Sequence, residues 1–571
     1  MILVFGGTTE GRKAVEVLEE AGNAYYYSTK TGEQDITLHH GVRMDGALDA
    51  EAMQGFCHEH SIRLIVDAAH PFASQLHRTI AQVSETLGIP VVRYERIYPP
   101  RDPGITWIDD YSQVPTDIHS LLATTGVQSI SKLKYLEAEG MKVIYRILNR
   151  ESSIQLAHQQ GATDEQLCFY PQMAEAEAVL MKESGESGGF SEKVEAAKVQ
   201  GMRIISLKRS EDFMVHGEWF IVNGPHGLRR AVEKLLPEFF SLHSGLTTGT
   251  CATAAAVAQT LRTLKGEMPD EVPVVLPNGE TIMVAVGYGD GYAYCTKEAG
   301  DDPDVTNGIE VRASVRLSDR FEIVGGEGVG RITLPGFDFP PGEAAINKAP
   351  REMMRNNIKE NVRITISVPQ GKEIAKRTFN PRLGIEGGIS IIGVSGIVKP
   401  FSEESFIESI RKCMVIAQAS GAERVVINSG AKSENFVRSL YPDLPRQAFV
   451  EYGNYIGETL KIAAELAVEK VTLGVMLGKA VKLAAGNLDT HSRRTTMDKE
   501  FILQMLREAG VAVDISDITL ARELWKKIPA SQIKDFVAVV ISHCYRHCKL
   551  LLPSGELTIL LIDDNGKIYA L

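Results

Sequence analysis

Short apolar runs alternate with amphipathic stretches along residues 1–240. The runs predict strands at 2–5, 63–67, 91–94, 143–146 and 203–207, and helical periodicity follows at 10–21 and 74–87. This order of strands and helices indicates a parallel, doubly wound α/β sheet. A further strand that ends in a turn at 121–126 marks a seam. We therefore expect two Rossmann-like lobes, about 1–121 and 122–240, that face a cleft.

Residues 244–571 differ in composition and in the pattern of apolar positions. The segment 244–345 is dense in Gly, Asp and Pro, with strands predicted at 272–276, 281–286 and 321–324. The tripeptide Pro277-Asn278-Gly279 predicts a hairpin turn between the first two. Alternation of strand and helix returns after about 390, with a strand at 425–428, a helix near 457–466 and a strand at 471–475. A second α/β domain of two parts is expected over 244–571.

Composition narrows the class of protein. The chain has 571 residues, 44% hydrophobic and 23% charged, which suits a globular protein of two to four domains. The net charge of −12 argues against nucleic-acid binding, because phosphate contacts need clustered Lys and Arg. No run approaches the ~20 apolar residues of a membrane span, and seven dispersed cysteines suit a reducing cytoplasm. We expect a cytoplasmic protein with small-molecule partners, no nucleic acid and no membrane; a homo-oligomer stays open.

The first candidate for chemistry is the turn Gly6-Gly7-Thr8-Thr9-Glu10-Gly11, between the first strand and the first helix. Glycines there let the backbone approach a pyrophosphate, and the helix N-terminus stabilises its charge. The third position is Thr8, which departs from the standard dinucleotide fingerprint. A tight turn without a ligand remains the alternative.

The residues after the second strand bear on which nicotinamide coenzyme is used. We expect that strand to end near Tyr27, followed by Ser28-Thr29-Lys30, with no acid before Glu33. Two hydroxyls and a lysine favour a 2′-phosphate, hence NADPH over NADH. An exposed polar turn is the alternative.

Two further segments follow predicted strands: Asp67-Ala68-Ala69-His70-Pro71-Phe72-Ala73 and Lys182-Glu183-Ser184-Gly185. Doubly wound folds bind ligands at the carboxyl ends of their strands. His70 could deliver a proton near neutral pH. A histidine at a strand end is also often only structural.

These pieces, with Thr124-Thr125-Gly126, resemble the precorrin-6A reductase family (CbiJ and CobK) over nearly all of 1–240. The sequence departs from the family pattern at Ala69, where a Thr is expected, and at Arg209-Ser210, where Arg-Pro is expected. The resemblance implies hydride transfer from NADPH or NADH to a precorrin, with His70 and Asp67 as catalytic candidates. The expected cofactor contacts are Gly6, Gly7, Thr8, Thr9, Glu10, Ser28, Thr29, Thr125, Gly126, Lys182, Ser184 and Gly185.

In the second half, Thr247-Thr248-Gly249-Thr250-Cys251 precedes an alanine-rich helix at 252–264. Hydroxyls and free N–H groups at a helix start could hold a ligand carboxylate. Two alternatives stay open: Cys251 as the nucleophile of a hydrolase, and plain N-capping by Thr250.

The densest chemical cluster is Lys297-Glu298-Ala299-Gly300-Asp301-Asp302-Pro303-Asp304. Carboxylates this close repel one another unless they meet a cation, act as a base or are fully solvated. The spacing breaks the calcium-loop template, because Pro303 intervenes and no Glu closes the loop. A solvated acidic turn is the alternative. We expect Asp301 to bind a ligand, and Asp302 and Asp304 to be catalytic.

Several other motifs occur in order along 244–571: Gly328-Val329-Gly330, 342–351, 379–390, 453–457, 478–486 and Thr490-His491-Ser492. Together they resemble CbiD, the cobalt-precorrin-5B C-methyltransferase family. The resemblance implies methyl transfer from S-adenosylmethionine to C-1 of the ring. It also implies an S5-like portion followed by a Rossmann-like portion from about 390. Lys348-Ala349 and Met476 depart from the family pattern. The expected substrate or donor contacts are Thr247, Thr248, Gly249, Thr250, Lys297, Asp301, Asn347, Arg351, Asn454, Lys479, Lys482 and His491.

The segment His543-Cys544-Tyr545-Arg546-His547-Cys548 has metal-like spacing, but its two pairs lie on adjacent strips of an apolar helix, so no metal site is predicted. The whole sequence predicts a fusion of two enzymes of corrin-ring biosynthesis. The alternative is a scaffold that binds NADPH and a tetrapyrrole without catalysis.

Overall fold

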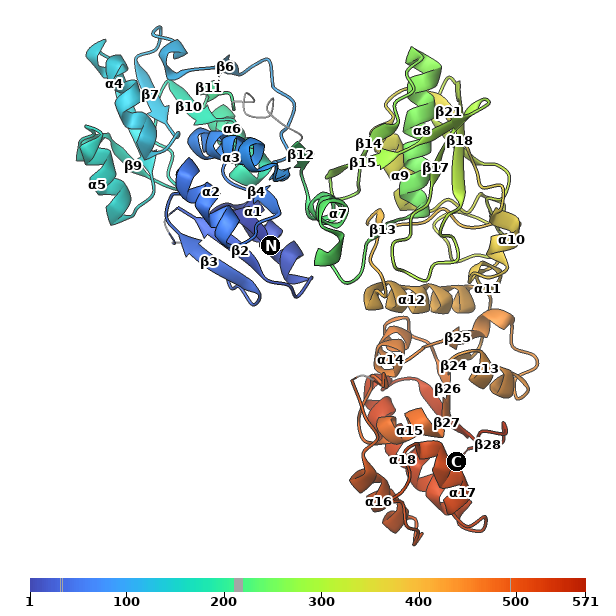
Figure 1. Cartoon of the computed structure of the whole chain (residues 1–571). Helices are drawn as coiled ribbons and strands as arrows, with labels where there is room; N and C mark the ends of the chain where they lie inside the picture. Colours follow the sequence, from blue (N-terminus) through green and yellow to red (C-terminus); the bar gives the residue numbers. More distant parts are fainter. Residues whose placement is uncertain (31, 33, 210–218, 493, 571) are drawn as a thin grey trace. The chain divides into compact units, whose positions relative to one another are not determined.

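The computed structural model describes residues 1–30, 32, 34–209, 219–492 and 494–570; Glu33 and Ser210 lie outside these ranges. The described chain forms two compact units (Figure 1). The first contains Met1–Ser244 and Pro273–Met283, and the second contains Gly245–Val272 and Val284–Leu571. No helix among the described residues is long and apolar enough to cross a bilayer.

The first unit has two parallel six-stranded sheets, as the alternating pattern predicts. Figure 1 draws this unit in blue to green. The first sheet has the order β12-β5-β4-β1-β2-β3. Its strands are β1 (Ile2–Phe5), β2 (Tyr25–Thr29), β3 (Gly41–Asp45), β4 (Leu64–Asp67), β5 (Val91–Tyr94) and β12 (Trp219–Val222), with helices α1 (Thr9–Glu19), α2 (Ala50–Glu59), α3 (Ser74–Leu87) and α7 (Pro225–Leu235).

The second sheet has the order β6-β11-β10-β7-β8-β9. Its strands are β6 (Thr106–Ile108), β7 (Ser120–Ala123), β8 (Lys142–Ile147), β9 (Leu167–Phe169), β10 (Ala178–Lys182) and β11 (Arg203–Leu207), with helices α4 (Ile130–Ala138), α5 (Glu151–Gln159) and α6 (Phe190–Val199).

The division between the lobes differs from the predicted seam near residue 121. Strand β6 precedes that seam but pairs with β11, and β12 returns from the end of the segment to pair with β5. Helix α7 also packs its apolar face into the core of the first sheet. The apolar pattern identifies strands but not their partners, so this exchange is invisible in the sequence.

The second unit begins with α8 (Thr248–Lys265), which is buried over most of its length against β17, β18 and β21. These strands belong to a five-stranded sheet of order β16-β17-β18-β21-β19. Its strands are β16 (Gly287–Gly289), β17 (Tyr292–Thr296), β18 (Glu310–Leu317), β19 (Glu322–Gly325) and β21 (Val362–Ser367). Helix α9 (Lys348–Asn357) packs on α8, and α11 (Asn380–Leu383) follows.

The last part of the chain forms a sheet of order β25-β24-β26-β27-β28, parallel except for β28. Its strands are β24 (Val425–Asn428), β25 (Phe449–Glu451), β26 (Lys470–Met476), β27 (Glu556–Ile562) and β28 (Ile568–Tyr569), with helices α12 (Glu403–Ala419), α13 (Ala431–Arg438), α14 (Ile456–Glu465), α15 (Leu477–Ala484), α16 (Lys499–Glu508) and α18 (Ile533–Leu551). The predicted return to strand and helix alternation is confirmed.

The predicted hairpin is also confirmed, as β14 (Glu271–Val275) and β15 (Thr281–Ala285) around Gly279, whose φ is +86°. Its tip belongs to the first unit. The Glu280 carboxylate, 1% exposed, accepts hydrogen bonds from the backbone N–H of His226 at 3.1 Å and of Gly227 at 3.4 Å. These groups lie in the first turn of α7, so Glu280 satisfies donors that the helix itself leaves unpaired.

Candidate functional site

The glycine turn lies between β1 and α1, as predicted. Thr8 caps α1, because its hydroxyl accepts from the Gly11 N–H at 3.0 Å and donates to the Ala68 carbonyl at 2.7 Å. Gly6 has no room for a side chain, since a Cβ would lie 2.1 Å from the Tyr27 hydroxyl. Gly7 has a φ of +89° and open space where its Cβ would be. The turn therefore presents bare backbone at the start of a helix.

Gln34 holds this turn and was not found from the sequence. The Gly7 N–H donates to the Tyr27 hydroxyl at 3.1 Å and to the Gln34 side chain at 3.2 Å. The Gln34 amide donates in turn to the Thr8 carbonyl at 2.9 Å. Nothing in the local pattern marks Gln34, because it reaches the turn from 26 positions away in the chain.

The end of β2 corrects the expectation of a turn after Tyr27. The strand continues to Thr29, so Ser28 and Thr29 are buried and only Lys30 is exposed. An acid is present after all, on the neighbouring strand: the Thr29 hydroxyl donates to Asp45 at 2.9 Å. Arg43 of β3 donates to the same carboxylate at 3.3 Å. Charged side chains beside the end of β2 therefore also come from β3, which sequence reasoning did not consider.

Asp67 ends β4 and is completely buried. Its carboxylate lies 2.6 Å from His77 Nδ1 and 2.9 Å from Arg93 Nη1, and accepts from the Ala69 N–H at 3.1 Å. Burial alone would raise the pKa of Asp67, but Arg93 and His77 hold that pKa below its usual value. Arg93 also donates to the Ala69 carbonyl at 3.0 Å. Asp67 thus fixes the loop to His70 and has no free face for substrate.

His70 is a neutral imidazole in this environment. Burial, with smaller effects of Arg96 and Lys182, lowers the pKa of His70 to about 3. Its Nδ1 accepts a hydrogen bond from the Phe72 N–H at 3.2 Å, which leaves Nε2 with the proton. The expected proton delivery by imidazolium at neutral pH is therefore disfavoured, and His70 can only donate a hydrogen bond from Nε2.

The carboxyl edges of the two sheets meet through Arg96, which follows β5. Arg96 donates to the Glu10 carboxylate at 2.9 Å and to the Ser184 carbonyl at 2.7 Å. Ser187 donates to the same Glu10 carboxylate. Gly185 has a φ of +68° and lies against the Arg96 side chain. The predicted segments around Glu10 and Ser184 are thus brought together by an arginine that the sequence analysis missed.

Four cations surround the edge of the second sheet: Lys132 of α4, Arg146 of β8, Lys182 of β10 and Lys193 of α6. None has an ion-pair partner among the described residues. Burial, helped by Lys132 and Lys193, lowers the pKa of Lys182 to about 8. Its ammonium lies 5.1 Å from the centre of the Phe72 ring, next to His70. This edge suits an anionic ligand.

Thr125 and Gly126 follow β7 at the same edge. The Thr125 hydroxyl lies 2.6 Å from that of Ser129, and Gly126 has a φ of +87°. The Gly126 carbonyl accepts from Ser129 at 2.7 Å. Both residues shape the turn into α4, and the partner recorded for the Thr125 hydroxyl is uncharged.

In the second unit, the threonines at the start of α8 bind the loop at 390–396. Thr250 donates to the Gly396 carbonyl at 2.6 Å, and Thr248 accepts from the Ile392 N–H at 2.9 Å. Thr247, and not Thr250, is the N-cap. Gly249 lies against Pro350 and the Ile392 carbonyl, and Cys251 is completely buried. The geometry supports a structural role and opposes both a carboxylate site and a hydrolase nucleophile here.

The acidic cluster is held by partners of its own. Asp304 accepts from Lys297, which is 2% exposed, at 2.7 Å and from the Thr306 hydroxyl at 2.6 Å. Burial would raise the pKa of Asp304, but these hydrogen bonds lower it. Asp302 accepts from the Phe401 N–H at 3.0 Å, and Asp301 is exposed. Asp304 therefore has Lys297 as its cation, which favours a structural role for this carboxylate over the expected catalytic one.

Arg351 and Asn347 likewise serve the local fold. Arg351 donates to the Ile346 carbonyl at 2.8 Å and stacks over Phe339 at 4.4 Å. Asn347 precedes α9 as its N-cap residue. Neither residue is brought near the acidic cluster by a recorded contact.

The remaining predicted contacts gather at the carboxyl edge of the last sheet. Lys479 donates to the Gly453 carbonyl, and Lys482 to the Thr490 carbonyl at 3.2 Å. The Asn454 carbonyl accepts from the Thr490 N–H at 3.1 Å. His491, next in the chain, donates its backbone N–H to Asp489 at 2.9 Å. The sequence motifs at 453–457, 478–486 and 490–492 therefore form one site.

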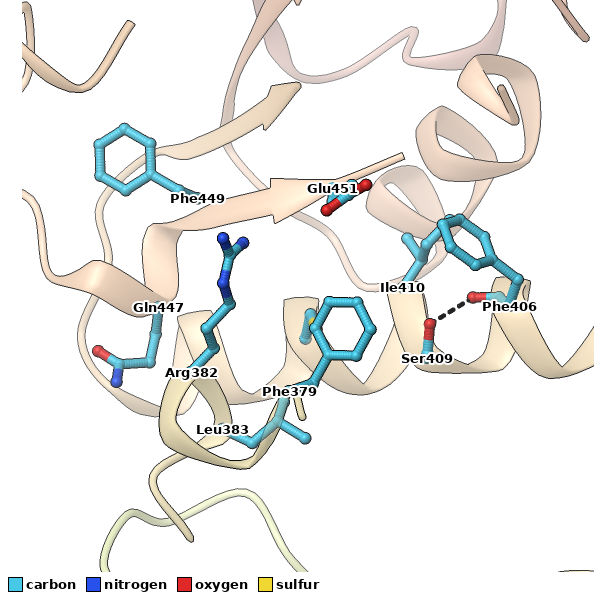
Figure 2. A pocket seen from close by; sticks show the side chains of 10 residues that line it. Phe379, Arg382, Leu383, Phe406, Ser409, Ile410, Gln447, Phe449 and Glu451 are labelled. Carbon is cyan, nitrogen blue, oxygen red and sulfur yellow. Dashed lines mark hydrogen bonds between the residues drawn. The ribbon is translucent and has the colours of Figure 1, made fainter. Parts of the chain in front are cut away.

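A pocket lies beside β25, and Figure 2 shows the side chains that line it. The set is Phe379, Arg382, Leu383, Phe406, Ser409, Ile410, Cys413, Gln447, Phe449 and Glu451. Arg382 is paired with Glu434 at 2.8 Å, whereas Glu451, the last residue of β25, has no recorded partner among the described residues. Burial raises the pKa of Glu451 against the opposing effect of Arg382. Sequence reasoning missed Glu451, although it lies two residues before the motif at 453.

The cysteines of α18 are part of the core, whereas its histidines are not. His543 Nε2 lies 2.7 Å from Glu508, and Cys544 and Cys548 are completely buried. Among the described residues, no group of three or more His, Cys, Asp or Glu side chains could hold a metal ion.

Comparison with known proteins divides the chain in the same order. A model described as precorrin-6x reductase CbiJ/CobK matches residues 1–222. CbiD matches 237–400 and the CbiD C-terminal domain matches 489–571. A cobalt-precorrin-5B C(1)-methyltransferase of Prosthecochloris aestuarii is 41% identical over 345 residues, which cover 56% of this chain and 94% of the relative. Its counterpart in Priestia megaterium is 39% identical and is covered over 84% of its length, with 52% of this chain.

Two solved structures are also similar to parts of the chain. A cobalamin biosynthesis protein (cbiD) from Archaeoglobus fulgidus is 31% identical, with a TM-score of 0.26 over 47% of this chain and 85% of that one. A CobK precorrin-6A reductase is 16% identical, with a TM-score of 0.34 over 41% of this chain and 96% of that one. By the sequence matches, the chain belongs to the CbiD family and carries a CbiJ/CobK reductase domain before it.

Proposed function

We propose that the chain is a bifunctional enzyme of cobalamin biosynthesis. Residues 244–571 transfer a methyl group from S-adenosylmethionine to C-1 of cobalt-precorrin-5B, giving cobalt-precorrin-6A. Residues 1–240 reduce (cobalt-)precorrin-6A to precorrin-6B with NADPH. The methyltransferase relatives support the first activity and the reductase match supports the second. The product of one half is the substrate of the other.

The observation that carries the reductase assignment is the meeting of three strand ends in the first unit. The glycine turn, the His70 loop and the Lys182 loop contact one another through Arg96 and Phe72. This is where doubly wound folds bind their ligands.

A nicotinamide dinucleotide fits the first lobe. Gly7 offers open space and Thr8 starts the helix, so Gly6, Gly7, Thr8, Thr9 and Glu10 would hold the pyrophosphate. Lys30 and Arg43, near Ser28 and Thr29, would bind a 2′-phosphate. The bound coenzyme supplies the hydride.

The second lobe suits the macrocycle, whose acetate and propionate groups are anionic. Lys132, Arg146 and Lys193 would pair with these carboxylates. Lys182 is the better proton donor, because its pKa of about 8 is nearer to neutral than that of His70, about 3. His70 would orient a substrate oxygen through Nε2.

The test is Gly7→Val, which places a branched side chain at a φ of +89° in the open turn. Purified enzyme is given cobalt-precorrin-5B, S-adenosylmethionine and NADPH, and the products are resolved by mass spectrometry. We expect methylation without reduction. If the wild-type enzyme leaves the substrate unmethylated and unreduced, the proposed function is wrong. If a folded Gly7→Val variant loses methylation, the two activities do not have independent sites.

A further inference from the structure

His77 lies in the first turn of α3 and is completely buried. The side chain of a helical residue leans toward the N-terminus of its helix, so the His77 ring reaches back to the loop that follows β4. Its Nδ1 lies 2.6 Å from a carboxylate oxygen of Asp67, and its Nε2 lies 3.0 Å from the carbonyl oxygen of His70. One ring therefore spans the loop from the end of β4 to His70.

Both groups that meet this ring are hydrogen-bond acceptors. The His70 carbonyl has no proton to give, and it also accepts from the Ala73 N–H at 2.8 Å. A neutral imidazole has one N–H and one lone pair, so it would turn that lone pair toward one of the two oxygens. A ring that donates from both nitrogens is an imidazolium.

The proton between His77 and Asp67 belongs to the histidine. The other oxygen of the Asp67 carboxylate accepts from Arg93 at 2.9 Å and from the Ala69 N–H at 3.1 Å. These donors stabilise the ionised form. Burial would raise the pKa of Asp67, but Arg93 and His77 lower it below its usual value. Asp67 is therefore a carboxylate that accepts from Nδ1.

An imidazolium also balances the charges of this buried group. Arg93, whose side chain is 0% exposed, pairs with Asp67 at 2.9 Å and with Glu95 at 3.3 Å. Two carboxylates then meet two cations, Arg93 and His77. A neutral His77 would leave these four groups with a net negative charge, which is unfavourable away from water. The dipole of α3 opposes a cation in its first turn, and the Asp67 carboxylate offsets that effect.

We infer that His77 is a positioning residue of the reductase site: its imidazolium ties the Asp67 carboxylate to the His70 carbonyl and so fixes where the His70 ring lies. The inference rests on the proposed reduction and adds a residue to its site. The same loop carries Phe72, whose N–H donates to His70 Nδ1 and whose ring lies 5.1 Å from the Lys182 ammonium. His77 therefore also places His70 relative to Lys182, the proposed proton donor.

The first experiment observes the two protons on the unmodified protein. The full chain, with isotopically labelled nitrogen in its 14 histidine rings, is studied by solid-state NMR. At about pH 8 ordinary histidines, with a pKa of about 6.5, are mostly neutral. His77, identified by the signals that His77→Gln lacks, should show two protonated ring nitrogens. A single protonated nitrogen would overturn the inference, whether or not the enzyme reduces a precorrin.

The second experiment follows the His70 ring in the same spectra. Burial, with smaller effects of nearby charges, lowers the pKa of His70 to about 3; those charges are Arg96, Lys182, Glu10 and Arg93. The wild-type ring should therefore stay neutral down to about pH 5. In His77→Gln the loop loses its charged tie and admits water, so the His70 ring should take up a proton between about pH 7 and pH 5. A change that only lowered stability would leave this signal as it is in the folded protein.

The third measurement is the rate of reduction. We expect His77→Gln to lower kcat for reduction about tenfold or more, because a displaced group no longer meets the substrate in a reactive arrangement. Methylation by the second unit should not change. The matched control is His58→Gln, an exposed histidine on α2, which should alter neither kcat nor the His70 signal.

Two results would overturn the positioning role in a folded His77→Gln variant: a wild-type kcat for reduction, or a His70 ring that stays neutral down to about pH 5. Failure of the proposed function is a separate outcome. It would appear as a wild-type enzyme that does not reduce precorrin-6A, whereas the protons on His77 are read without any substrate.

Discussion

The guanidinium of Arg96 lies 2.9 Å from the carboxylate of Glu10, and each side chain is only 5% exposed. Glu10 starts α1 of the first lobe, and Arg96 also reaches the Ser184 carbonyl of the second. Burial would raise the pKa of Glu10, but Arg96 lowers it. The ion pair therefore joins the carboxyl edges of the two sheets of the first unit.

Removing one partner of this ion pair should destabilise the first unit. Arg96→Met leaves Glu10 buried without its cation, and we expect a loss of about 3–5 kcal/mol in the stability of the first unit. The double variant Glu10→Gln/Arg96→Met should lose clearly less than the sum of the single changes. Hydrogen-exchange mass spectrometry of β1 and β10 measures the loss of stability in the single and double variants. Additive losses would show that the two side chains are not energetically coupled.

The stability of the first unit should depend on pH through Asp67. Its pKa is lowered in the fold, so its contribution is complete above the unfolded value of about 3.9 and disappears as the pH falls through the lower folded value. Urea unfolding between about pH 2.5 and 6 should show this decline in the wild type. Asp67→Asn should be less stable at neutral pH, because Arg93 loses its carboxylate, and should show a smaller decline in acid. An unchanged pH dependence would contradict the buried ion pair.

Coenzyme choice should rest on Lys30 and Arg43. Charge-assisted hydrogen bonds to a 2′-phosphate contribute about 1.5–3 kcal/mol each, so Lys30→Ala/Arg43→Ala should lower the NADPH to NADH ratio of kcat/KM at least tenfold. Arg78→Ala, an exposed arginine on α3 with no recorded partner, is the control. Wild-type enzyme that prefers NADH would reject this prediction.

The expected catalytic role of the acidic cluster can be tested directly. Asp304→Asn should destabilise the second unit, because Lys297 is 2% exposed and loses its partner. Single-turnover methylation at a temperature where the variant is folded should stay near the wild-type rate, as should that of Asp302→Asn. A loss of ~10²-fold or more would return these carboxylates to the active site.

Much of the fold follows from the pattern of apolar residues. The strands at 91–94, 203–207 and 425–428 and the helix at 74–87 have the predicted bounds, because buried strands and amphipathic helices leave strong periodic signals. The crossing of β6 and β12 between the lobes left no such signal. Strand partners depend on contacts between distant segments, which one sequence does not report.

The candidate sites show the same limit. The glycine turn was recognisable because backbone exposure requires glycine at that point. Arg93 lies in a buried strand and Arg96 follows it. A charged residue in an apolar strand is a signal of a buried ion pair that the sequence does contain. Gln34, Asp45 and Glu451 reach their sites from other elements. The acidic cluster was conspicuous in sequence, yet one of its carboxylates, Asp304, is paired locally with Lys297.

The hairpin tip that Glu280 anchors to α7 determines where the two units can be separated in the gene. The first unit is encoded in two pieces, Met1–Ser244 and Pro273–Met283, with the whole of α8 between them. A truncation after residue 244 would remove the acceptor for the His226 and Gly227 N–H groups. It would also remove Ile282, which lies with Val222 beside Gly227. A chimera that exchanges the reductase with that of another organism would therefore need to include both pieces. Otherwise the start of α7 would need a new acceptor for its free N–H groups.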